Sequence, residues 1–186
     1  MRTRQWTRHE CAGARPSPRY GHSACHVAES IYVLGGHLAG GTINDLWEYA
    51  LETRAWTQVV SAGESAPSLR SGHWLVPLGN RLVVFGGDLA NSVFDSALHC
   101  FDLQRRRWSD LAVGGDHSRV RAFHAAIPCG GGVLIFDGRG SGHELSNDTF
   151  LLRVSDLAAG GEHPRARKGA TAILCGDGVF IFGRQD

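Results

Sequence analysis

Residues 70–87 read RSGHWLVPLGNRLVVFGG, and this stretch decides the fold because the chain repeats it. Residues 19–36 (RYGHSACHVAESIYVLGG) and 121–138 (RAFHAAIPCGGGVLIFDG) are copies spaced 51 residues to either side. A weaker copy, residues 167–184, begins 46 residues after the third. Each copy opens with an arginine and closes with an apolar run that leads into glycine. Landmarks that recur in one order at one spacing indicate a tandem repeat.

Each repeat reads as four short strands. In the first unit these are SACHVA, IYVLGG, LWEYAL and AWTQVV, which are rich in β-branched and aromatic residues and are separated by turn-forming residues. The second runs are apolar at successive positions, a pattern typical of a central strand packed on both faces. A tryptophan near the end of the repeat unit is a third landmark, at Trp6, Trp56 and Trp108.

Four short strands per unit of about 50 residues are typical of a propeller blade. The motifs resemble those of the kelch-repeat family: a Gly-His pair opens the first strand, glycines end the second at residues 35–36 and 86–87, Tyr49 and Phe101 end the third, and Trp56 and Trp108 lie on the fourth. The resemblance implies an all-β, kelch-type β-propeller of about three and a half four-stranded blades. It also implies that the aromatic residues pack between blades and that the glycine pair permits a sharp turn.

We expect one array over residues 1–186, divided as 1–12 (the last strand of a preceding blade), 19–60 (blade), 70–112 (blade), 121–156 (degenerate blade) and 167–186 (incomplete blade). The third unit is degenerate because Asp137-Gly138 replaces the double glycine and no tryptophan stands near position 159. Complete propellers have roughly 4–8 blades. The chain is therefore a piece of a longer protein, a small ring, or half of a ring shared by two copies, and we favour the piece.

Composition narrows the function. The net charge of +1 offers no concentrated basic surface, so neither a nucleic acid nor a membrane is expected as partner. Five scattered cysteines without a C-x-x-C pair argue against a disulfide framework and a structural zinc site. The N-terminal stretch lacks the apolar segment of a signal peptide, so we expect the cytoplasm, with the nucleus also open.

Successive strands of a blade run in opposite directions, so alternate loops lie at the same end of the blade. This predicts one binding face. The loops after the second strand (37–45, 88–96 and 139–148) and those between blades (60–70, 112–121 and 156–167) should lie at the same end. Long polar loops on a rigid scaffold are common binding sites. In kelch proteins, which these repeats resemble, that end commonly captures peptide or protein ligands.

Eight residues near this end are the candidates for partner binding: Arg19, His37, Arg70, Asp88, Arg121, Arg139, His143 and Arg167. Arginine pairs with carboxylates through its planar fork, so an acidic peptide is the ligand we expect. Four of the arginines recur in register, which favours a structural role for them. The other four residues are not repeated and are individually better candidates.

Catalysis and metal binding have weaker support. His22, His73 and His124 recur at one position per blade, which indicates a scaffold role, and no histidine cluster has ligand-like spacing. We predict no cofactor and no metal. The alternative is a metal-dependent or specifier-type kelch enzyme at the channel mouth, with Asp45, Asp148, His37 and His143 as its residues. The favoured interpretation is a protein-binding scaffold, whose ring a second copy or a longer chain would complete.

Overall fold

The protein is an open array of antiparallel β-sheets, seen in a computed structural model. The structure describes residues 5–61, 65–90, 93–111, 120–129, 132–140, 142–153, 168–175 and 178–184. Every regular element in this part of the chain is a strand. The predicted all-β class is therefore confirmed.

The first two repeats form complete four-stranded blades. Blade one consists of β1 (Ser23–Val27), β2 (Ser30–Leu38), β3 (Gly41–Ala50) and β4 (Ala55–Gln58), paired in that order. Blade two pairs β5 (Trp74–Leu78), β6 (Arg81–Phe85), β9 (Leu98–Asp102) and β10 (Arg107–Leu111) in the same way. An extra hairpin, β7 (Asp88–Ala90) with β8 (Val93–Phe94), occupies the loop after its second strand.

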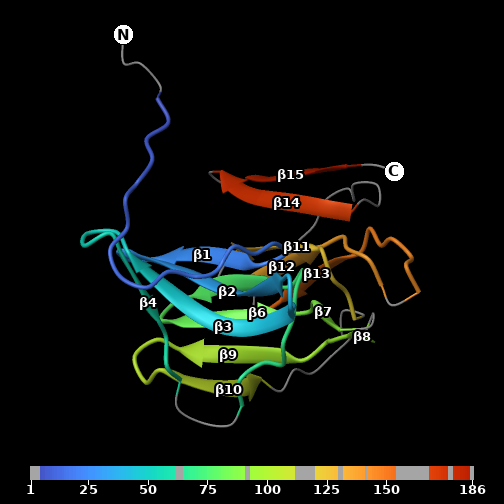
Figure 1. The fold of residues 1–186 in the computed structure, drawn as a ribbon. Coiled ribbons are helices and arrows are strands. Elements are labelled where there is room, and N and C mark those ends of the chain that lie inside the picture. The colour runs from blue at the N-terminus through green and yellow to red at the C-terminus, as the bar shows by residue number, and fades with distance from the viewer. Residues whose placement is uncertain are drawn as a thin grey trace.

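The later repeats are less complete in the described residues. β11 (Ala125–Cys129), β12 (Gly132–Phe136) and β13 (Thr149–Leu152) form a three-stranded sheet, and β14 (Lys168–Cys175) pairs with β15 (Gly178–Arg184). The fourth strand expected within 121–156 would fall largely outside the described residues. The first strands of successive repeats are neighbours along the inner side of the array, in the order β1, β5, β11 and β14. The β14–β15 sheet lies on the side of the array opposite the outer strands β9 and β10 (Figure 1). This arrangement is the predicted partial propeller.

The core lies between successive blades. One cluster joins blades one and two and includes Leu34, Leu82 and Val84, each fully buried. A second cluster joins blades two and three. The aromatic landmarks pair across the two outer strands, with ring centroids 4.9 Å apart for Tyr49–Trp56 and 5.0 Å apart for Phe101–Trp108. The consecutive apolar residues of β2, β6 and β12 are mostly buried, so in these three blades the sequence pattern reflects packing on both faces of the sheet.

The two glycines of the pair at residues 86–87 are each required, but for different steric reasons. A Cβ at Gly86 (φ +68°) would lie 2.5 Å from the Arg121 carbonyl oxygen and 2.7 Å from Cε1 of His124, both in the next blade. A Cβ at Gly87 (φ +105°) would lie 2.9 Å from Cβ of His73 in its own blade. The first glycine therefore admits the following blade, and the second admits the first strand of the same blade.

Two expectations were wrong in detail. Residues 37–45 are mostly strand and not loop, because β2 and β3 continue as a hairpin beyond a register shift between Leu34 and Gly36. A strand was also expected over residues 1–12, yet residues 5–11 form none, Ala12 makes one parallel bridge to Ala55, and Trp6 is fully exposed. A fourth strand needs a third strand to pair with, and the described residues provide none for it.

Adding a methyl group at Gly86, where two blades meet, should destabilise the protein far more than adding one at Gly79, which faces open space. Gly79 has φ +57° and nothing near its would-be Cβ, so Gly79→Ala should cost about 1 kcal/mol from backbone conformation alone. Gly86→Ala adds overpacking against the next blade and should cost about 2–4 kcal/mol in total. Urea denaturation of both variants measures the difference, and equal losses would contradict this account of the contact between blades.

Candidate functional site

The repeated arginines are internal clamps. Arg70 and Arg121 are 0% and 2% exposed. Each of the three repeated arginines that the structure describes donates a hydrogen bond to the backbone carbonyl 16 residues later: Arg19 to Gly35 at 3.1 Å, Arg70 to Gly86 at 2.9 Å and Arg121 to Asp137 at 2.8 Å. The guanidinium thereby ties the loop before the first strand to the end of the second strand.

Each clamp also has a carboxylate partner. The nitrogen–oxygen distances are 2.5 Å for Arg19–Asp45, 2.9 Å for Arg70–Asp95 and 3.8 Å for Arg121–Asp148. Burial alone would raise the pKa of Asp45, but hydrogen bonds from Arg19 and Trp47 outweigh it and lower that pKa. Because their donors are engaged within the blade, these arginines are poorly placed to meet a ligand.

The residue after Gly36, Gly87 and Gly138 differs from blade to blade although its backbone position is the same. These residues bridge to the residue after the repeated arginine: Tyr20–His37, Ser71–Asp88 and Ala122–Arg139. His37 packs on Tyr20 with ring centroids 5.1 Å apart, and Oδ1 of Asp88 is buried without a hydrogen bond. The same backbone position therefore carries an imidazole, a carboxylate and a guanidinium on three successive blades.

Arg139 is unlike the clamps. Its guanidinium carbon lies 5.5 Å from the ring centroid of Phe94 and 5.7 Å from that of Phe123. Among the described residues no carboxylate pairs with it, and its Nε atom is buried without a hydrogen-bond partner. Cation–π contacts orient the side chain but leave donors unpaired, which is the arrangement of an anion-binding arginine.

Phe123 departs from the repeat at a cost. It occupies the position of Gly21 and Gly72 and keeps their left-handed backbone, with φ +57°. Its ring lies where a Cβ on Gly72 would meet it at 2.9 Å. A bulky residue at positive φ is strained by about 1–2 kcal/mol, and such strain is concentrated at functional sites.

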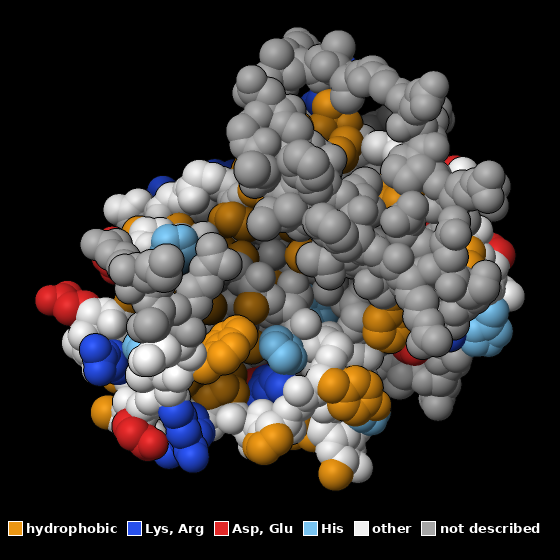
Figure 2. Space-filling model, turned by 90° about the horizontal axis from the view of Figure 1, so that it is seen from above, with side chains coloured by type: hydrophobic (Ala, Val, Ile, Leu, Met, Phe, Trp, Pro, Cys, Tyr) orange, Lys and Arg blue, Asp and Glu red, His pale blue; other side chains and the backbone are white. Residues whose placement is uncertain are grey.

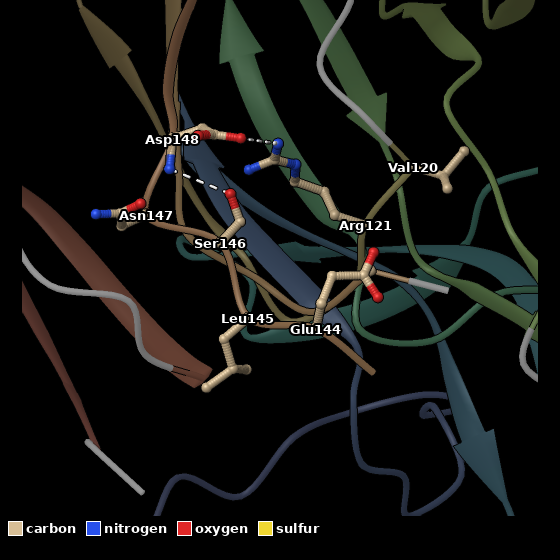
Figure 3. Close-up of a pocket in the computed structure, with 8 residues that line it drawn as sticks. Val120, Arg121, Glu144, Leu145, Ser146, Asn147 and Asp148 are labelled. Carbon is tan, nitrogen blue, oxygen red and sulfur yellow. Dashed lines mark hydrogen bonds and ion pairs between the residues drawn. The ribbon is translucent and has the colours of Figure 1, made fainter. Parts of the chain in front are cut away.

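A pocket of about 270 Å³ lies beside this cluster, because Arg139 bridges to Leu145 of its lining. It is lined by Val120, Arg121, Gly140, Glu144, Leu145, Ser146, Asn147 and Asp148 (Figure 3). The guanidinium of Arg121 points toward Asp148, whose backbone N–H is bonded to the Ser146 hydroxyl. The pocket is polar and of mixed charge.

The structure brings only some of the predicted residues together. Arg19 and His37 line a second, open pocket of about 440 Å³ on blade one. His143 is exposed at the tip of the loop that includes Gly140, with φ +65°. Arg167 lies outside the described residues. The sequence did not single out Phe94 or Phe123, although a phenylalanine in a glycine register was a visible signal for the second.

The enzyme alternative has no support in the described part of the chain. Asp45 and Asp148 are paired with clamp arginines, and the two histidines proposed with them are on different blades. No group of three or more metal-ligating side chains occurs among the described residues. His73 and His124 are buried, and burial followed by the neighbouring arginines lowers the pKa of each to about 3. These two imidazoles are neutral packing groups.

Blades of four antiparallel strands that pack on one another through apolar clusters and glycine–histidine contacts define a β-propeller protein. A family model described as the KLHDC2/KLHL20/DRC7 Kelch-repeats domain matches residues 1–183, so the chain belongs to the kelch-repeat family. No helix that could cross a membrane occurs among the described residues.

Individual relatives are distant and longer. The chain is 29% identical to acyl-CoA-binding domain-containing protein 4 of Arabidopsis thaliana over 80% of its own length and 24% of that protein. It is 29% identical to Kelch domain-containing protein 3 of Bos taurus over 67% of its own length and 33% of that protein. In the structure of YjhT, 58% of the chain matches 88% of this one, with a TM-score of 0.68 and 19% identity, which shows the fold alone.

Acidification should destabilise the protein through His73 and His124, which are buried where one blade meets the preceding one. In the unfolded chain a histidine takes up a proton near pH 6.5, but His73 in the folded protein does so only near pH 3. Stability is therefore lost as the pH falls below 6.5, by about 2 kcal/mol per buried histidine at pH 5. Urea denaturation at pH 7 and pH 5 should show a smaller loss for His73→Leu than for the unchanged protein. The exposed control His26→Leu should leave the loss unchanged, and identical losses in all three proteins would refute this origin.

Proposed function

We propose that the protein is an interaction module that binds an acidic segment of a partner protein on its loop end, with Arg139 as the anchor. The observation that carries this proposal is the orientation of Arg139 between two aromatic rings without a carboxylate partner in the described residues. The kelch-repeat family supports an interaction module in general. The acidic ligand and the face rest on this site.

Apolar side chains surround the anchor and suggest the ligand's other residues. Phe123, whose ring Arg139 contacts, and Leu145, across the bridge from Arg139, are 37% and 36% exposed. A cation within a partly apolar rim is sheltered from water, which strengthens its attraction for an anion. The ligand we propose has one acidic residue flanked by large apolar residues.

The adjoining pocket argues against a strongly anionic ligand. Glu144 and Asp148 contribute carboxylates to it, and the guanidinium of Arg121 is already paired with Asp148. A second negative charge on the ligand would meet these carboxylates and not a second free arginine. The surface should therefore select a single carboxylate together with polar groups that can enter the pocket.

Binding of short peptides tests the anchor. Fluorescein-labelled peptides with one glutamate between leucine or phenylalanine residues should bind, and the same peptides with glutamine should bind at least about tenfold more weakly. Arg139→Gln should reduce affinity for the glutamate peptides by a similar factor. Arg139→Lys should retain part of it, because lysine keeps the charge but lacks the planar fork. Fluorescence anisotropy measures all four cases.

Arg107→Gln is the matched control, because Arg107 is exposed at the start of β10, at the opposite end of blade two (Figure 1). It should leave affinity unchanged. An equal effect of the two arginine-to-glutamine changes, or equal binding of glutamate and glutamine peptides, would show that the proposed anchor is wrong.

A further inference from the structure

Asp88 is a second charged side chain near the Arg139 anchor that lacks a partner. Its Oδ1 atom is buried without a hydrogen bond, as is the Nε atom of Arg139. No ion pair or hydrogen bond engages its carboxylate in the part of the chain that the structure describes. Its Oδ2 atom is not among the buried unpaired atoms, so solvent reaches it. The carboxylate can therefore accept a hydrogen bond from a ligand.

Asp88 and Arg139 adjoin the same aromatic ring. Asp88 on β7 is the cross-strand partner of Phe94 on β8, and residues directly opposite each other in a hairpin project to the same face. The guanidinium carbon of Arg139 lies 5.5 Å from the centroid of the Phe94 ring. No ion pair joins the carboxylate to the guanidinium in the described residues. Two unlike charges thus lie next to Phe94 without neutralising each other.

The contact between blades two and three holds these two residues in place. Asp88 directly follows Gly87, whose N–H donates to the Arg121 carbonyl at 2.9 Å. Arg139 bridges to Ala122, which directly follows Arg121. A short path of paired backbone therefore links Asp88 to Arg139. Their spacing is fixed before any ligand arrives, and such preorganisation favours selective binding.

Unpaired charges of opposite sign favour a ligand that carries both. A carboxylate bound to Arg139 comes near Asp88, and like charges repel each other. A cation on the same ligand offsets this repulsion and gives Asp88 the donor that it lacks. In the face seen from above, charged side chains of both signs are dispersed among hydrophobic and uncharged ones (Figure 2). Charge selectivity therefore has to come from individual side chains and not from a broad field of one sign.

We propose that Asp88 determines the specificity of this site, so that the ligand carries a basic residue close to the acidic residue bound by Arg139. This inference rests on the proposed function, because the Arg139 anchor fixes where the ligand lies. Residues two apart in an extended peptide project to the same side, about 7 Å from each other. That spacing suits two protein charges with one aromatic ring beside them. The ligand class is therefore an extended segment with glutamate and lysine two positions apart, whose neighbouring residues are apolar.

Fluorescence anisotropy with labelled peptides tests the role of Asp88. The peptides have a glutamate between leucines and either lysine or leucine two positions away, on the N-terminal or the C-terminal side. In the better of the two orders, the unchanged protein should bind the lysine peptide at least about fivefold more tightly than the leucine peptide.

Asp88→Asn should change the two affinities in opposite directions. It removes an attraction for the lysine peptide, which should bind more weakly, and a repulsion for the leucine peptide, which should bind more tightly. Asparagine has the shape of aspartate, and thermal melting verifies that the variant is folded. A merely structural role of Asp88 would instead lower both affinities by the same factor.

Glu52→Gln is the control, because it removes the same charge from an exposed residue in the β3–β4 turn, at the opposite end of blade one (Figure 1). It should leave both affinities unchanged. Equal binding of lysine and leucine peptides by the unchanged protein in both orders, or a lysine preference that persists in Asp88→Asn, would overturn this inference alone. Replacing the peptide glutamate by glutamine tests the anchor separately. If that replacement had no effect, the Arg139 anchor and this inference would both be wrong.

Discussion

The fit of a histidine ring into the space left by a missing Cβ is the constraint on which the array depends. Where blade two meets blade one, and where blade three meets blade two, the imidazole is buried against a glycine of the preceding blade. A buried imidazole without hydrogen-bond partners is unfavourable alone, but glycine adopts a positive φ without steric cost and leaves room for the ring, so together they allow two sheets to approach closely. The arginine clamp then fixes the loop that bears the histidine, and the apolar clusters fill the space behind it.

The clamps also show that one residue type occurs in two different environments in this protein. Arg70 has a carboxylate and a carbonyl as partners and is fully buried, whereas the contacts of the Arg139 guanidinium within the described part of the chain are with aromatic rings, and its Nε has no hydrogen-bond partner there. The distinction is electrostatic and not positional, because both arginines lie near the loop end of their blades. A ligand can compete for the second arginine at little cost, but it would have to break a buried ion pair to reach the first.

Much of the fold could be predicted because it is written in periodic residues. The apolar second strands, the paired Tyr49 and Trp56, and the glycine pairs all recur, and each reports a contact that every blade must make. The site was less predictable, since it consists of exceptions. Phe123 stands in a glycine register, and Phe94 belongs to the inserted hairpin β7–β8, so neither takes part in the repeat. The expected strand at Trp6 failed for the related reason that a motif cannot form a strand without a neighbour to pair with.

The sequence by itself determined the repeat, the strand-rich blades and the family, because these depend on local pattern and on spacing along the chain. Only the tertiary structure decided which arginines are occupied, since their partners are 25 and 26 residues away along the chain and shift from Asp45 in blade one to Asp95 in blade two. It also decided that Arg139 lies between Phe94 and Phe123, which come from different blades. Contacts between blades depend on how whole sheets pack, and that packing is not encoded in any one repeat.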